Sequence, residues 1–108
     1  MRALTAEQIK ERLIPHPSWR LEDVWLARDL KFADFEAAWQ FMSHVADCAT
    51  QQDHHPNWYN VYNTVHIRLS SHDANGITER DFALAESIDQ YLTNAHHIDL
   101  PATPIFST

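Results

Sequence analysis

The order of the apolar repeats constrains the fold of this chain more than any other feature. Residues 5–13, 34–51 and 78–92 repeat apolar residues at the spacing of helices that pack along one face. Residues 19–32 and 58–70 carry shorter apolar runs that alternate with polar residues, imperfectly in the first run and regularly in the second. The order helix, two strands, helix, two strands, helix, without crossovers, predicts an α+β fold. In it, three helices cover an antiparallel four-stranded sheet.

Capping patterns predict where the helices begin. Thr5 with Gln8, and Thr78 with Asp81, have the spacing of capping boxes, and Asp34 is the expected N-cap of the middle helix. The apolar residues of the middle helix predict one buried stripe, made of Phe35, Ala38, Trp39, Met42, Val45, Ala46 and Ala49.

Turn chemistry predicts two special backbone positions. Between the strands of the second hairpin, Tyr62 and Asn63 form the expected turn, with Asn63 in the left-handed conformation. Gly76 is the only glycine of the chain and lies in a polar loop, where we expect a positive φ.

Length and charge narrow the class of protein. A length of 108 residues predicts a single domain, 1–108, in which residues 93–108 form an irregular tail. Lys and Arg number 8 against 15 Asp and Glu, a net charge of −7, which argues against nucleic-acid binding. Cys48 is the only cysteine, and neither a membrane span nor a signal peptide is evident, so we expect a cytoplasmic protein.

Histidines are expected to meet at one end of the predicted sheet. His54 and His55 come directly before the second hairpin, and His72 follows its last strand. Because an antiparallel hairpin brings its two ends together, these side chains would share one edge, which Asp81 could also reach. Purely structural roles also stay open, since His55 could be a surface spacer and Asp81 could do no more than cap its helix.

The residue types favour proton transfer over metal binding and over nucleophilic catalysis. A zinc site needs three or four converging ligands, and Cys48 falls on the helix expected to be buried. No Ser or Cys motif for nucleophilic catalysis accompanies the histidines. Imidazole titrates near neutrality, with a pKa of about 6.5, so it can both donate and accept a proton.

The histidine segments resemble one known family. The sequences DHHPNWYNVYN at 53–63, VHI at 65–67, LSSH at 69–72 and GITERD at 76–81 are similar to the pterin-4a-carbinolamine dehydratases, as are FADF at 32–35 and FMSHVA at 41–46. The likeness extends from about residue 5 to residue 92. It implies a single α+β domain, homodimers or homotetramers, and no metal or cofactor. The implied reaction is the loss of water from 4a-hydroxytetrahydropterin, which recycles the pterin cofactor of aromatic amino-acid hydroxylases.

The resemblance also implies roles for individual residues. His54 and His72 would be the acid/base pair, and His55 would chiefly bind the pterin. Asp81 matches a carboxylate near the pocket, and the pterin ring could rest on Trp58. The chain departs from the family at Thr50, where members often carry a glutamate.

Other functions remain possible at this point. Animal relatives also act as dimerization cofactors for a transcription factor, so the chain could be an interaction protein without catalytic activity. It could also be a divergent member that acts on another pterin or on an intermediate of the molybdenum-cofactor pathway.

Overall fold

The computed structural model describes residues 2–102 and has the expected order of elements. The helices are α1 (Ala6–Leu13), α2 (Phe35–Gln52), α3 (Glu79–Leu92) and the short 3-10 helix η1 (His72–Ala74). The strands are β1 (Arg20–Glu22), β2 (Trp25–Lys31), β3 (Asn57–Val61), β4 (Thr64–Leu69) and β5 (Ile98–Asp99).

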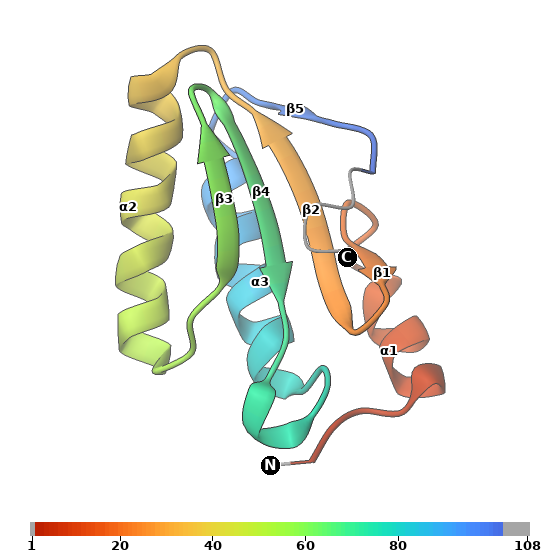
Figure 1. Ribbon diagram of the computed structural model, residues 1–108. Coiled ribbons are helices and arrows are strands. Elements are labelled where there is room, and N and C mark those ends of the chain that lie inside the picture. The colour runs from red at the N-terminus through yellow and green to blue at the C-terminus, as the bar shows by residue number, and fades with distance from the viewer. Residues whose placement is uncertain (1, 103–108) are drawn as a thin grey trace.

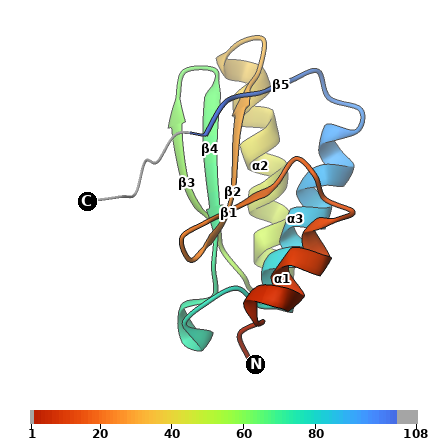
Figure 2. The same ribbon diagram turned by 90° about the vertical axis from the view of Figure 1, so that its right-hand side faces the viewer.

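One antiparallel sheet forms one layer of the molecule (Figure 1), with the strand order β1-β2-β4-β3. Helices α1, α2 and α3 lie on one face of this sheet (Figure 2), which confirms the α+β prediction. Strand β5 is an addition to the four expected strands, because Leu30 and Lys31 of β2 pair with Asp99 and Ile98. The tail expected to be irregular therefore contains a strand, and residues 103–108 lie outside the described residues.

The core lies between the sheet and the helices. Leu26, Leu30, Val65, Ile67 and Leu69 alternate along β2 and β4 and are completely buried. The helices cover them with large side chains, among them Phe41, Val45, Phe82, Leu84 and Ile88.

The buried stripe of α2 differs from the predicted one. Phe35 and Trp39 are 45% and 56% exposed, whereas Phe41, which lies outside the predicted stripe, is completely buried. The buried residues of α2 are Ala38, Phe41, Val45 and Ala49. Apolar residues occur around much of this helix, so its periodicity allowed two neighbouring stripes, and the contact with the sheet selects one of them.

The predicted caps are present. Thr5 and Gln8 form a capping box on α1, and Thr78 and Asp81 form one on α3. The side chain of Asp34 accepts a hydrogen bond from the backbone N–H of Ala37 at the start of α2. Caps depend on residues within one turn, which is why the sequence predicts them well.

The positive φ angles expected at Asn63 and Gly76 occur instead at the preceding residues, Tyr62 and Asn75. Tyr62 has φ 50°, while the side chain of Asn63 donates to the carbonyl of Phe32 at 2.8 Å. Asn75, at the end of η1, has φ 56°, and Gly76 has no positive φ. A Cβ on Gly76 would lie 3.3 Å from Cβ of Ala3, so close packing explains this glycine.

Candidate active site

A pocket of about 290 Å³ at one end of the sheet brings His54, His55 and His72 together. The first two follow the end of α2, and His72 follows β4 and begins η1. The antiparallel pairing of β3 with β4 makes these distant segments neighbours. The pocket is lined by Asp53, His54, His55, Ser70, His72, Asp73 and Arg80.

A sharp reversal at the end of α2 positions His54. Asp53 adopts the left-handed conformation with φ 50° and ends the helix, and the backbone N–H of His54 donates to the carbonyl of Ala49 at 3.0 Å. His54 is only 6% exposed, and its Nε2 lies 2.6 Å from Oδ1 of Asp81. His54 is therefore held by its partner on α3 as well as by its own backbone.

Asp81 is completely buried in the first turn of α3. Its Oδ2 accepts hydrogen bonds from the backbone N–H of Thr78 and from Oγ of Ser71, both at 2.8 Å. Asp81 thus caps its helix through one oxygen and binds His54 through the other. A carboxylate can only accept hydrogen bonds, so Nε2 of His54 carries the proton and the lone pair of the neutral ring is on Nδ1.

The other pocket histidines are exposed. His55 and His72 both lie at the solvent-facing side of the pocket. The ring of Trp25 meets that of His72 edge-on, with centroids 6.3 Å apart and planes at 81°. An exposed imidazole can exchange protons with bulk water, which the buried His54 does less readily.

Arg80 and Asp73 form an ion pair beside His72, in which one guanidinium nitrogen contacts both carboxylate oxygens. Nη2 of Arg80 lies 2.7 and 2.8 Å from the two carboxylate oxygens of Asp73. Desolvation raises the pKa of Asp73, but the hydrogen bond and charge of Arg80 outweigh it and hold that pKa below its ordinary value. The pair ties η1, which carries His72, to the first turn of α3.

Sequence reasoning missed Arg80 and Ser71 as residues of this region. Both lie inside the segments that carry the resemblance, LSSH at 69–72 and GITERD at 76–81. Their positions next to His72 and Asp81 were the available signal. Which side chain each one contacts is a long-range property that spacing does not provide.

Trp58 and Thr50 do not line the pocket. Trp58 of β3 pairs with Ile67 of β4 and packs against the core on the helix-covered side of the sheet. Thr50 is exposed on α2, and its hydroxyl donates to the carbonyl of Ala46 at 3.0 Å. A pterin contact with Trp58 stays a prediction that this arrangement does not support.

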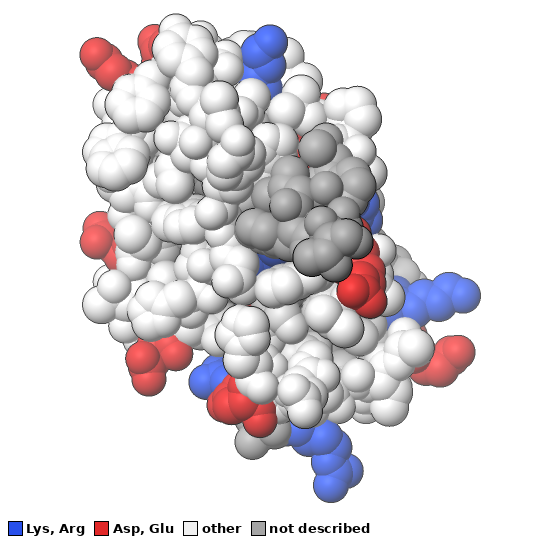
Figure 3. All heavy atoms as spheres, viewed as in Figure 1, with Lys and Arg blue, Asp and Glu red and all other residues white. Residues whose placement is uncertain are grey.

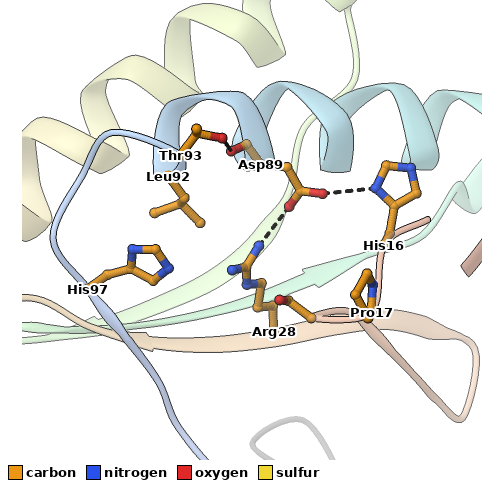
Figure 4. A pocket seen from close by; sticks show the side chains of 8 residues that line it. His16, Pro17, Arg28, Asp89, Leu92, Thr93 and His97 are labelled. Carbon is orange, nitrogen blue, oxygen red and sulfur yellow. Dashed lines mark hydrogen bonds and ion pairs between the residues drawn. The ribbon is translucent and has the colours of Figure 1, made fainter. Parts of the chain in front are cut away.

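A second cavity, of about 240 Å³, lies between the sheet and the C-terminal end of α3 (Figure 4). Arg28 and His16 both point toward Asp89, with Nη1 of Arg28 at 2.7 Å and Nδ1 of His16 at 2.9 Å from its oxygens. Arg28 also donates from Nε to Asp99 of β5 at 2.8 Å. Because these polar groups already pair with one another, we interpret this cavity as structural.

Within residues 2–102, no group of three or more His, Cys, Asp or Glu side chains is placed to hold a metal ion. None of the helices in this range has the length and apolar character that crossing a bilayer requires. On the face seen in Figure 3, the visible basic side chains are scattered and form no patch.

Fold and pocket together define an α+β protein with a histidine-lined site at one end of its sheet. The family model described as pterin 4 alpha carbinolamine dehydratase matches residues 2–91, and the chain belongs to this family.

The names of similar proteins agree with this family assignment. A Burkholderia ambifaria protein named "Putative pterin-4-alpha-carbinolamine dehydratase" is 51% identical over 89 residues, 80% of this chain and 86% of the relative. A Burkholderia cenocepacia protein of the same name is 48% identical over 95 residues, 85% of this chain and 92% of the relative. The crystal structure of a transcriptional coactivator/pterin dehydratase from Brucella melitensis superposes with a TM-score of 0.80 at 36% identity. It covers 82% of this chain and 97% of the other.

Proposed function

We propose that this protein is a hydro-lyase that converts 4a-hydroxytetrahydropterin to quinonoid dihydropterin and water. The observation that carries the proposal is the pocket in which His54, backed by Asp81, shares one space with His55 and His72. Membership of the dehydratase family supports the same reaction.

The reaction moves protons without a change in oxidation state. The bond between C4a and the hydroxyl oxygen breaks, the oxygen takes a proton and leaves as water, and N5 loses its proton as the C4a=N5 double bond forms. Hydroxide is a poor leaving group, so a general acid must protonate the oxygen while a general base accepts the N5 proton. No electrons are gained or lost, and the chemistry therefore needs no redox cofactor.

We assign the base to His54 and the acid to His72. Neutral His54 donates Nε2–H to Asp81 and accepts the N5 proton at Nδ1, and the resulting imidazolium is stabilised by the Asp81 carboxylate. Protonated His72 delivers its proton to the 4a oxygen and regains one from water, because its ring is exposed. His55, at the mouth of the pocket, is assigned to binding the pterin.

Substitution of each histidine tests the assignment by stopped-flow measurement of dehydration. His54→Ala and His72→Ala should each lower kcat by about 10²–10⁴-fold, the usual contribution of a general acid or base. His44→Ala, on the exposed surface of α2, is the matched control and should stay within about twofold. Unchanged turnover in the double variant of His54 and His72 would refute the acid/base assignment.

We also propose that the protein works as a homo-oligomer in the cytoplasm and serves a pterin-dependent hydroxylase. The exposed, stacked rings of Phe35 and Trp39 on α2 support the oligomer, because large apolar side chains that stack in the open commonly mark contact surfaces. Free Cys48 is consistent with a reducing compartment.

A non-catalytic interaction protein is the second candidate. The name of the Brucella melitensis structure includes a transcriptional coactivator, and the exposed rings of α2 offer a surface for a partner. Capture of a stoichiometric partner together with no turnover of 4a-hydroxytetrahydropterin would favour this function. Retained histidines with turnover of another pterin only would instead indicate a divergent member of the family.

A further inference from the structure

Ser71 and Thr78 place two buried hydroxyl groups behind the Asp81 carboxylate. The two residues are shielded from solvent almost completely, with exposed fractions of 1% and 0%. Oγ of Ser71 lies 2.8 Å from Oδ2 of Asp81 and also 2.8 Å from Oγ1 of Thr78. The acid/base assignment made above for His54 and His72 uses neither hydroxyl.

The number of available hydrogens fixes the direction of these contacts. A hydroxyl has one hydrogen to donate, and a carboxylate can only accept. Ser71 gives its only hydrogen to Asp81, so in the second contact Ser71 accepts and Thr78 donates. Oγ1 of Thr78 in turn accepts from the backbone N–H of Arg80 at 3.2 Å. A one-way chain of donors therefore runs from the first turn of α3 to Oδ2 of Asp81, and each bond in it polarises the next.

This chain determines which oxygen of Asp81 faces His54. Oδ2 accepts from Ser71 and from the backbone N–H of Thr78, and Oδ1 is left to meet Nε2 of His54 at 2.6 Å. The terminal torsion of an aspartate has a broad minimum, so its partners set the plane of the carboxylate. Without the Ser71 hydroxyl, the Thr78 N–H alone would hold Oδ2, and both the orientation and the tautomer of His54 would be less strictly set.

The backbone of Ser71 holds the segment that carries the histidine assigned as the acid. Its N–H donates to the carbonyl of Gly76 at 2.8 Å, and the N–H of Gly76 donates back at 3.3 Å, which closes a bridge between the two residues. Helix η1 lies between them and begins at His72, the residue next to Ser71. Ser71 is thus joined to His72 by its backbone and to His54 through Asp81.

We propose that Ser71 is a positioning residue of the dehydration reaction, which holds Asp81 so that His54 keeps its place and tautomer relative to His72. The inference rests on the proposed function, because it concerns how the assigned acid and base are arranged. The base accepts the N5 proton while the acid protonates the oxygen on the adjacent C4a, so a small displacement of either ring slows the step. Ser71 does not line the histidine pocket and therefore acts through Asp81.

Two substitutions separate the hydroxyl of Ser71 from the rest of the residue. Ser71→Ala removes the hydroxyl and leaves the backbone bridge to Gly76 in place. Ser71→Thr keeps a hydroxyl, and the extended backbone of this position, with φ −110° and ψ 103°, suits a β-branched residue. In stopped-flow dehydration, Ser71→Ala should lower kcat by about 10–100-fold and change KM by less than about twofold. Ser71→Thr should recover kcat to within about threefold of the wild type, because it can donate to Asp81 as serine does.

Ser87→Ala is the matched control. The hydroxyl of Ser87 on α3 also makes two hydrogen bonds, one with Nε2 of Gln52 at 2.9 Å and one with the carbonyl of Ala83 at 3.2 Å. Neither partner is Asp81. The loss of this hydroxyl should therefore leave kcat within about twofold of the wild type, as substitutions away from a functional site usually do.

The ring nitrogen signals of His54 in NMR test the hold on this residue apart from catalysis. These signals distinguish a protonated imidazole nitrogen from an unprotonated one, and comparison with His54→Ala identifies those of His54. The wild type should show Nε2 protonated and Nδ1 unprotonated. In folded Ser71→Ala the two signals should move toward one another as the second tautomer becomes populated, while the signals of the exposed His55 stay unchanged.

Three outcomes would overturn the inference: an unchanged kcat in Ser71→Ala, His54 signals that do not move in that variant, or an equal loss of kcat in Ser71→Thr. A wild type that does not dehydrate 4a-hydroxytetrahydropterin would refute the proposed function instead. In that case the His54 signals would still report whether Ser71 holds the ring through Asp81.

Discussion

Asp81 shows how one side chain can satisfy a structural and a chemical demand at once. Its Oδ2 completes the cap of α3 through the N–H of Thr78, and its Oδ1 binds Nε2 of His54. Hydrogen bonds to both carboxylate oxygens therefore hold the side chain of Asp81 in place. The contact with Asp81 in turn holds the ring of His54, although the two residues are 27 positions apart in the sequence.

Replacing this carboxylate by the amide should separate the two roles. In Asp81→Asn, the amide oxygen can still accept from Thr78 and Ser71, but the amide nitrogen then faces Nε2 of His54 and favours the tautomer with the proton on Nδ1. The base loses its lone pair at Nδ1, so kcat should fall by about 10²-fold or more. Stopped-flow dehydration combined with urea unfolding measures both effects. A normal kcat in a folded variant would contradict the proposed tautomer.

The ion pair of Arg80 with Asp73 predicts that Arg80 helps to position His72. Arg80→Ala frees η1 from α3, so His72 should become less well positioned and kcat should fall several-fold, more than KM changes. In the same variant the pKa of Asp73 should rise toward its ordinary value, because its cationic partner is gone.

NMR titration of the Asp73 carboxyl follows that rise. Arg80→Lys keeps the charge and should recover part of the rate. The swap of both charges, Arg80→Asp with Asp73→Arg, should recover more of it than either single change. A rate that is the same in all variants, despite the shifted pKa, would show that the pair does not position His72.

At the scale of elements, a buried network joins three strands on the face of the sheet away from the helices. Asp29 of β2 is 1% exposed and accepts from Nδ1 of His66 at 2.7 Å, from Nη1 of Arg68 at 3.0 Å and from Nη2 of Arg20 at 2.8 Å. Arg68 continues to Glu22 of β1 at 2.9 Å. Breaking a buried pair by removing one partner leaves the other charge uncompensated.

This network predicts how stability depends on acid pH. Burial alone raises the pKa of Asp29, but hydrogen bonds from His66, Arg20 and Arg68 outweigh it, so the folded pKa lies below the ordinary 3.8. The carboxylate therefore contributes its stability above pH 3.8, and this contribution is lost as the pH falls through the folded pKa. The wild type should lose stability in that acid range.

Asp29→Asn should lower the free energy of unfolding by about 3–5 kcal/mol at pH 7 and weaken its dependence on pH below 3.8. Urea unfolding over a series of pH values measures both. Asp34→Asn is the matched control, because Asn is as good an N-cap as Asp. Equal acid sensitivity of Asp29→Asn and wild type would show that Asp29 is not the group responsible.

At the scale of the whole molecule, the exposed aromatic side chains predict how copies associate. Phe35 and Trp39 of α2 stack with centroids 6.1 Å apart and planes at 19°, and both are exposed to solvent. Trp39→Lys should shift the molecule toward smaller species in sedimentation velocity. It should change the stability of the subunit by no more than about 0.5 kcal/mol, as surface substitutions usually do. A wild type that sediments as a monomer would refute the proposed oligomer, and an unchanged mass in the variant would refute this surface.

Local interactions explain which features the sequence predicts. The capping residues Thr5, Asp34 and Thr78 act within one helical turn, and the alternation of Val65, Ile67 and Leu69 follows from the geometry of a single strand. The meeting of His54 with His72 also follows from sequence, because the two ends of a hairpin must lie together.

Longer-range packing decided the rest. The choice between Phe41 and Trp39 as the buried ring of α2, and the pairing of β5 with β2, depend on elements distant in the chain. The sequence by itself determined that helices and hairpins form in this order and carry their histidines to one edge. Only the tertiary structure decided that Asp81 binds His54, because a hydrogen bond between separate elements requires the whole core to hold them in place.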